Sequence, residues 1–92
     1  MSSFKHVNPI YRTEADKLAK GLLENSIEFY YYDCWDGVQI VCDGWDAICH
    51  KGSYGHEQGL LEIMGTIVRA DDDDVEGWLT AEEILQRLNL TV

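Results

Sequence analysis

Residues 27–49 read IEFYYYDCWDGVQIVCDGWDAIC. Two Asp-Gly pairs, Asp36-Gly37 and Asp43-Gly44, divide this stretch into three segments rich in apolar residues. Asp-Gly between apolar segments is a strong signal for a two-residue β-hairpin turn of type I′. The stretch therefore predicts a three-stranded antiparallel meander, with strands over residues 27–34, 38–42 and 45–49.

The two predicted turns set how the strands pair. They place Trp35 opposite Val38 in the first hairpin and Cys42 opposite Trp45 in the second. Successive side chains of a strand point to opposite faces of a sheet. One face then gathers most of the large apolar side chains, with Asp33 as its only polar residue. We expect this face to be the core face; it holds Ile27, Phe29, Tyr31, Trp35, Val38, Ile40, Cys42, Trp45, Ala47 and Cys49.

The second face of the meander is mixed, but its centre is apolar and acidic side chains surround it. If the helices cover only the core face, an aromatic patch with an acidic rim indicates an interface with another protein. The alternative is that the N-terminal segment or residues 51–70 cover this face. The candidate partner-binding surface consists of Tyr30, Tyr32, Val41, Asp46 and Ile48.

Helices are predicted on either side of the meander. Apolar residues recur at helical spacing from Thr13 to residue 23, and the segment Thr13 to Asp16 resembles a capping box. Asn25-Ser26 is expected to end this helix. Near the C-terminus, Thr80 and Glu83 form a second capping box before an amphipathic segment.

The remaining segments are harder to assign. Residues 4–7 are compatible with a short strand that ends at Pro9. Residues 51–59 are expected to form a loop, and the apolar run that follows predicts a short helix within residues 60–68. The predicted fold class is therefore α+β, a single domain over residues 1–92. It has an N-terminal helix, a three-stranded antiparallel β-meander and one or two short C-terminal helices packed mainly on one sheet face.

The composition restricts the possible partners. The 92 residues carry a net charge of -10 and only seven Lys and Arg. Direct binding to nucleic acid is disfavoured because phosphates are bound by cationic side chains, and an anionic membrane surface is disfavoured likewise. No long apolar run suggests a signal peptide or a membrane span. With three Cys, a reduced cytoplasmic location is the simplest expectation. The charge suits a basic protein or a cation.

The acidic residues are concentrated near the C-terminus, where residues 72–83 read DDDVEGWLTAEE. This segment resembles the calcium loop of EF-hand proteins, which places oxygen ligands at fixed positions and a glycine at the sixth. Gly77 stands at that sixth position. The resemblance implies a calcium site formed by Asp72, Asp74, Glu76, the carbonyl of Trp78, Thr80 and Glu83.

The segment departs from the EF-hand pattern in several ways, among them that Asp71 stands just before the loop, where an apolar residue is usual. Glu76 is longer than the residue usual at its position, Gly65 weakens the incoming helix, and the chain has no second loop of this kind. The alternative is an acidic turn leading into a capped helix, since acidic residues favour a helix N-terminus without any metal.

The cysteines and histidines do not form a complete catalytic or zinc-binding pattern. Cys34 is predicted on the opposite face from Cys42 and Cys49, which lie roughly 13 Å apart along the ladder at ~3.3 Å per residue. This separation excludes a shared zinc ion or a disulfide between them. Cys49 and His50 point to opposite faces, although His56 could approach a cysteine from the loop. No enzymatic activity and no cofactor other than a possible calcium ion are therefore expected.

These observations favour a small acidic protein that works by binding another protein. Such a protein could be an accessory or inhibitor protein of a phage or mobile element. The clustering of acids in one segment makes broad imitation of a nucleic-acid duplex less attractive. The alternative function is a calcium-binding module that uses the loop at residues 72–83.

Overall fold

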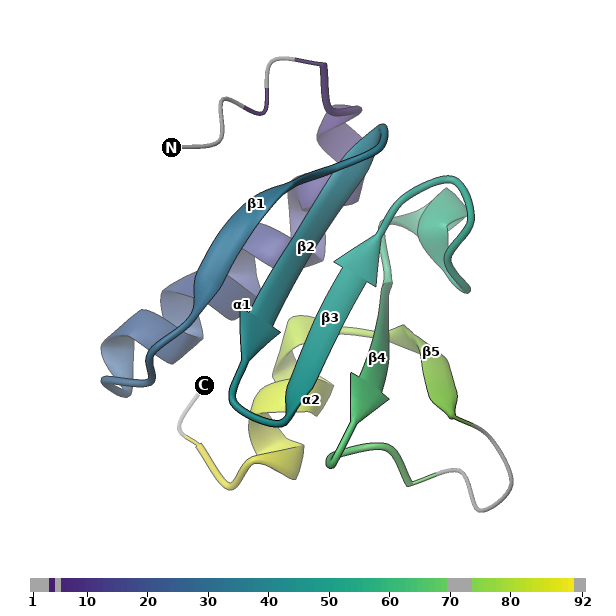
Figure 1. Cartoon of the computed structure of the whole chain (residues 1–92). Coiled ribbons are helices and arrows are strands. Elements are labelled where there is room, and N and C mark those ends of the chain that lie inside the picture. Colours follow the sequence, from purple (N-terminus) through teal and green to yellow (C-terminus); the bar gives the residue numbers. More distant parts are fainter. Residues whose placement is uncertain (1–3, 5, 70–73, 91–92) are drawn as a thin grey trace.

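The computed structural model describes residues 4, 6–69 and 74–90. They form one antiparallel sheet with the strand order β1-β2-β3-β4-β5, together with an N-terminal and a short C-terminal α-helix (Figure 1). The elements are the 3₁₀ turn η1 (Pro9–Arg12), α1 (Thr13–Glu24), β1 (Tyr30–Cys34), β2 (Gly37–Cys42), β3 (Trp45–Cys49), the 3₁₀ turn η2 (His56–Gln58), β4 (Leu61–Gly65), β5 (Val75–Leu79) and α2 (Ala81–Arg87).

The sheet has five strands instead of the three predicted. The prediction of a helix within residues 60–68 is wrong, because this segment contains β4, in which Ile63 pairs with Ala47 of β3. A short apolar run is compatible with either element, and here the pairing partner decides. The fifth strand, β5, lies within the acidic segment, where Val75 pairs with Met64 of β4.

The pairing of β2 with β3 is confirmed, with Cys42 opposite Trp45. The predicted pairing of β1 with β2 is wrong by two residues, because Cys34 lies opposite Gly37 and the turn is Trp35-Asp36. Only one residue in each turn has a positive φ, Trp35 in the first and Gly44 in the second, so neither turn is of type I′. An even shift leaves the side chains of the paired residues Tyr30 to Cys34 on their predicted faces, whereas Trp35 moves into the turn.

Gly37 provides the physical reason for this shift. A Cβ atom at Gly37 would lie 1.8 Å from the carbonyl oxygen of Cys49, so the start of β2 requires a glycine in the strand. The glycine is therefore used for a close approach of two strands rather than for the turn. Trp35, predicted to belong to the core, lies in the turn and is 74% exposed.

The N-terminal helix is confirmed over Thr13–Glu24, but its predicted cap is wrong. The helical segment already begins in η1, where the Asn8 side chain accepts a hydrogen bond from the Ile10 backbone at 3.2 Å. His6 and Val7 lie in a turn, so the strand proposed for residues 4–7 does not include them. The capping box of α2 is confirmed, with both reciprocal bonds between Thr80 and Glu83 present.

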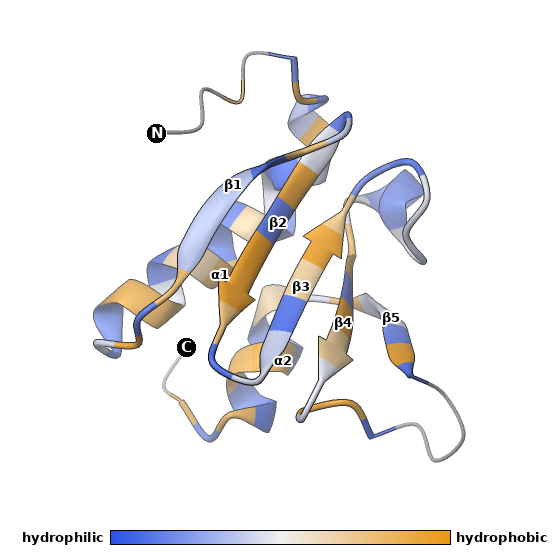
Figure 2. Cartoon of the chain, viewed as in Figure 1, coloured by the Kyte–Doolittle hydropathy of each residue, from blue (hydrophilic) through white to orange (hydrophobic). Residues whose placement is uncertain are grey.

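Both α-helices pack on the same side of the sheet, behind it as drawn in Figure 1. The core lies between the helices and this face. The hydrophobic colouring of β2, β3 and β4 in Figure 2 includes residues on both faces, since the strands alternate. The buried core consists of Val7, Tyr11, Ala15, Leu18, Leu22, Val38, Ile40, Trp45, Ala47, Cys49, Leu61, Ile63, Leu79, Ala81, Ile84 and Leu85.

Candidate functional site

The sheet face turned away from both helices is the candidate site, and we call it the open face. Strand pairing builds a row across all five strands, in which Tyr30 lies beside Val41, Val41 beside Asp46, Asp46 beside Met64, and Met64 beside Val75. A second row places Tyr32 beside Gln39 and Gln39 beside Ile48. The open face thus consists of Tyr30, Tyr32, Gln39, Val41, Asp46, Ile48, Met64 and Val75.

The five residues of the predicted partner-binding surface all lie on this face. Tyr30 is 72% exposed and Met64 is 49% exposed, while Val41 and Ile48 are half-buried by their neighbours. The sequence did not indicate Met64 and Val75, because one lay in a predicted helix and the other in the predicted calcium loop. Alternation around Ile63 was the signal that could have placed Met64 on this face.

Polar side chains on the open face form a chain of hydrogen bonds across β1, β2 and β3. The Tyr32 hydroxyl donates to Oε1 of Gln39 at 2.8 Å. The Gln39 amide in turn donates to Oδ2 of Asp46 at 2.9 Å. These bonds hold Tyr32 and Asp46 in fixed orientations, so both side chains are already ordered before any partner binds.

The segments proposed as a cover for this face do not reach its centre in the described part of the chain. Residues 61–65 form a strand of the sheet itself. The loop before it covers only one end, where the carboxylate of Glu62 is buried and accepts a hydrogen bond from the Tyr54 backbone at 3.1 Å. At the same end, the Trp35 ring packs against His50, with 4.9 Å between the ring centroids.

The distribution of charge makes the sheet acidic. None of the five strands contains a Lys or Arg, and residues 21–50 contain six Asp and Glu but no Lys or Arg. Among the described N-terminal residues, Arg12 precedes α1 and pairs with Asp16, and Lys17 within α1 pairs with Glu14. The open face therefore presents apolar and acidic groups without a basic side chain from any strand.

The residues of the predicted calcium loop are only partly described, since Asp72 lies outside the described residues. Glu76 lies in β5 and binds Arg87 through both carboxylate oxygens, at 2.6 and 2.8 Å. It also accepts the backbone N–H of Arg69 at 2.9 Å. These contacts, the Arg87 hydrogen bond first, lower the pKa of Glu76 to about 2.

The other predicted ligands have contacts of their own. Asp74 is exposed at the start of the described segment. Thr80 and Glu83 bind each other in the capping box of α2. The backbone N–H of Trp78 donates to the carbonyl of Tyr54 at 3.2 Å. Among the described residues, no group of three or more His, Cys, Asp or Glu side chains is arranged to hold a metal ion.

The three cysteines are free thiols, and Cys49 is fully buried. Burial raises the pKa of Cys42 to about 11 and the pKa of Cys49 to about 12. Both thiols are therefore protonated at neutral pH and are poor nucleophiles. His56, which could have approached a cysteine, instead has its Nδ1 atom 3.3 Å from the Tyr11 hydroxyl.

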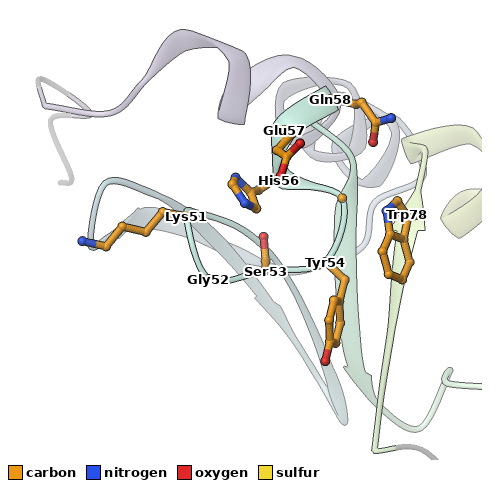
Figure 3. A pocket seen from close by; sticks show the side chains of 9 residues that line it. Lys51, Gly52, Ser53, Tyr54, His56, Glu57, Gln58 and Trp78 are labelled. Atoms are coloured by element: carbon orange, nitrogen blue, oxygen red, sulfur yellow. The ribbon is translucent and has the colours of Figure 1, made fainter.

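The loop between β3 and β4 forms an open pocket of about 400 Å³ that the sequence did not indicate (Figure 3). At one wall the rings of Tyr54 and Trp78 stack, with their centroids 5.2 Å apart. Trp78 has a φ of 58°, in the left-handed region that bulky residues seldom adopt. The pocket combines exposed aromatic rings with the polar side chains of Lys51, Ser53, His56, Glu57 and Gln58.

Comparisons with protein-family models, with curated proteins and with solved structures find no match to this chain. Within the described residues, neither helix is long and apolar enough to cross a membrane. The chemistry of the open face is therefore the basis on which a function can be proposed.

Proposed function

We propose that the chain is a small non-enzymatic protein-binding module and that its open face holds a basic, partly apolar segment of another protein. The observation that carries this proposal is the row from Tyr30 to Val75, which crosses all five strands on the face that the helices leave uncovered. Isolated apolar residues are normal on a protein surface, whereas several apolar residues gathered on one uncovered sheet face, here around the acidic Asp46, are typical of an interface.

The apolar side chains of the open face and the negative charge of the sheet act on different steps of binding. The apolar side chains supply affinity when water is released from them. The negative charge of the sheet speeds the encounter with a positive partner and selects against acidic proteins. Because Tyr32 and Asp46 are already held by Gln39, binding loses less side-chain entropy at these positions.

The partner's basic segment gives this module a simple biological use. Basic protein surfaces commonly bind nucleic-acid phosphates. A small acidic protein that occupies such a surface blocks access to nucleic acid. We propose this inhibitory or accessory role, of the kind found in phages and mobile elements, as the setting in which the open face acts.

Selection from a random peptide library displayed on phage tests the proposal without knowledge of the natural partner. We expect the selected peptides to be rich in Arg or Lys and to contain aliphatic or aromatic residues. We further expect the double variant Tyr30→Ala with Ile48→Ser to weaken their binding at least about tenfold, which corresponds to about 1.4 kcal/mol.

A matched control lies on the other side of the molecule. Leu23 is 70% exposed on α1, and Leu23→Ser should leave peptide binding unchanged. Selected peptides without basic residues, or peptides that bind the open-face variant as well as the original chain, would contradict the proposal. Amide spectra of both variants establish that the fold is intact before binding is compared.

A further inference from the structure

The sheet ends in two outer strands, β1 and β5, and neither is followed by another strand in the described structure (Figure 1). An outer strand presents backbone N–H and C=O groups that can pair with a strand of another chain. Natural proteins usually disguise such edges with bulges, lysine or proline. The two edges of this sheet differ in that respect.

The β1 edge is regular, and no described strand pairs with it. The hairpin closes at the pair Cys34–Gly37, and in an antiparallel hairpin this pair and every second pair exchange backbone hydrogen bonds. The intervening residues Tyr31 and Asp33 therefore direct their N–H and C=O groups away from β2. No backbone hydrogen bond between these groups and another described segment is present, and β1 contains neither Lys nor Pro.

The β5 edge is irregular. Its pairing with β4 contains a register shift between Leu61 and Ile63. Trp78 adopts a φ of 58°, and its N–H is already bound to the Tyr54 carbonyl. A bulged strand with a left-handed residue twists its edge and does not offer an even row of backbone groups. Of the two edges, β1 is the one suited to accept a strand.

The charges around β1 restrict which strand can be added at this edge. A second copy of this chain would carry the same net charge of -10, so the two copies would repel each other at this edge. On the helix side of β1, the Tyr31 hydroxyl donates to Asp16 at 2.7 Å, and Asp16 is also paired with Arg12. Asp33 is exposed there and has no basic partner among the described residues. A basic strand suits this environment.

We infer that the partner's basic segment binds as an added β-strand along β1, through the outward backbone groups of Tyr31 and Asp33. This inference rests on the proposed function and specifies how the segment is held. Side chains of the added strand alternate between the two faces. Those beside Tyr30 and Tyr32 extend the open face and are apolar, and those beside Asp33 are Arg or Lys.

Amide hydrogen exchange measured by NMR tests this geometry, with a blocked eight-residue peptide of alternating Arg and Val as the probe. We expect the amides of Tyr31 and Asp33 to exchange at least about tenfold more slowly with the peptide than without it, because only a backbone hydrogen bond protects them. A peptide of the same sequence, N-methylated at every residue, keeps the charge but has no edge that can pair with β1, so it should not protect them.

Two substitutions at one position separate backbone pairing from charge. Asp33→Pro removes the outward N–H, and proline is tolerated on the open side of an edge strand. Asp33→Asn keeps the N–H and removes the charge. We expect the proline variant to lose peptide protection at Tyr31 and the asparagine variant to retain it with weaker binding. Unchanged amide signals for β2 to β4 establish that the proline variant is folded.

Several outcomes would overturn the inference. Shifts at Tyr30 and Ile48 without slower exchange at Tyr31 and Asp33 would mean that the open face binds peptide but that β1 takes no strand, so the proposed function would stand alone. Slow exchange of both amides without peptide would show that the edge is already occupied. Protection that rises with protein concentration alone would identify a second copy as the occupant. No protection at millimolar peptide would also refute strand addition.

Discussion

Ser26 adopts an unfavourable backbone conformation in the motif that ends α1. It has a φ of 58° at the end of α1, where Ser26 N–H binds the Leu23 carbonyl and Ile27 N–H binds the Leu22 carbonyl. These two bonds define a Schellman motif, in which glycine is the preferred residue at the left-handed position. The same motif ends α2, where Asn89 holds the left-handed position with a φ of 61°.

Ser26→Gly should therefore stabilise the protein. The left-handed conformation costs an L-residue roughly 1–2 kcal/mol, and part of the gain is offset by the greater freedom of glycine in the unfolded chain. We expect the free energy of unfolding in urea to rise by about 0.5–1 kcal/mol. Ser26→Ala, which keeps the Cβ atom, should show no gain. A loss of stability in the glycine variant would mean that the motif does not strain Ser26.

At the scale of elements, the Glu76–Arg87 pair joins β5 to α2. Both side chains are largely buried, with 23% and 14% of their surface exposed. A depressed carboxyl pKa contributes stability that is complete above the ordinary value of 4.5 and is lost as the pH falls toward the folded value of about 2. The contact between β5 and α2 should therefore weaken in this acidic range.

Glu76→Gln tests this linkage. At pH 7 we expect the variant to lose about 1–3 kcal/mol of unfolding free energy, the usual cost of removing a hydrogen-bonded charge from a partly buried site. The difference from the original chain should shrink as the pH falls from 4.5 toward 2, because the original carboxylate becomes protonated in this window. Glu82→Gln, at an exposed position on α2, is the control. A difference independent of pH would contradict the assigned pKa.

The elements that could be predicted are those with strong local signals. The helix at Thr13–Glu24 follows from apolar spacing, α2 from its capping box, and the β2–β3 pairing from Asp43-Gly44. The β1–β2 register could not be predicted, because Gly37 is needed for a close approach to Cys49, which is a contact between strands. The local sequence around Gly37 does not show that another strand passes so close to it.

Local sequence patterns also predicted only part of the candidate site. Alternation along the first three strands identified Tyr30, Val41 and Ile48, but Met64 and Val75 belong to strands that the local pattern did not reveal. The calcium site stays a prediction, because Asp72 lies outside the described residues. Such a site would have to draw Glu76 away from Arg87.

For the whole molecule, the net charge opposes association between copies of the chain, whereas the uncovered sheet face favours it. At pH 7 the net charge of -10 keeps copies of the chain apart, whereas near the isoelectric point of 4.4 this repulsion vanishes and the open face can meet another copy. We expect light scattering to report a monomer at pH 7 in low salt and larger species near pH 4.4. Ile48→Asn, on the open face, should reduce this association, while Leu23→Asn, on exposed α1, should not. Equal association of both variants would show that copies meet through another surface. The open face would then not be the surface through which this protein self-associates.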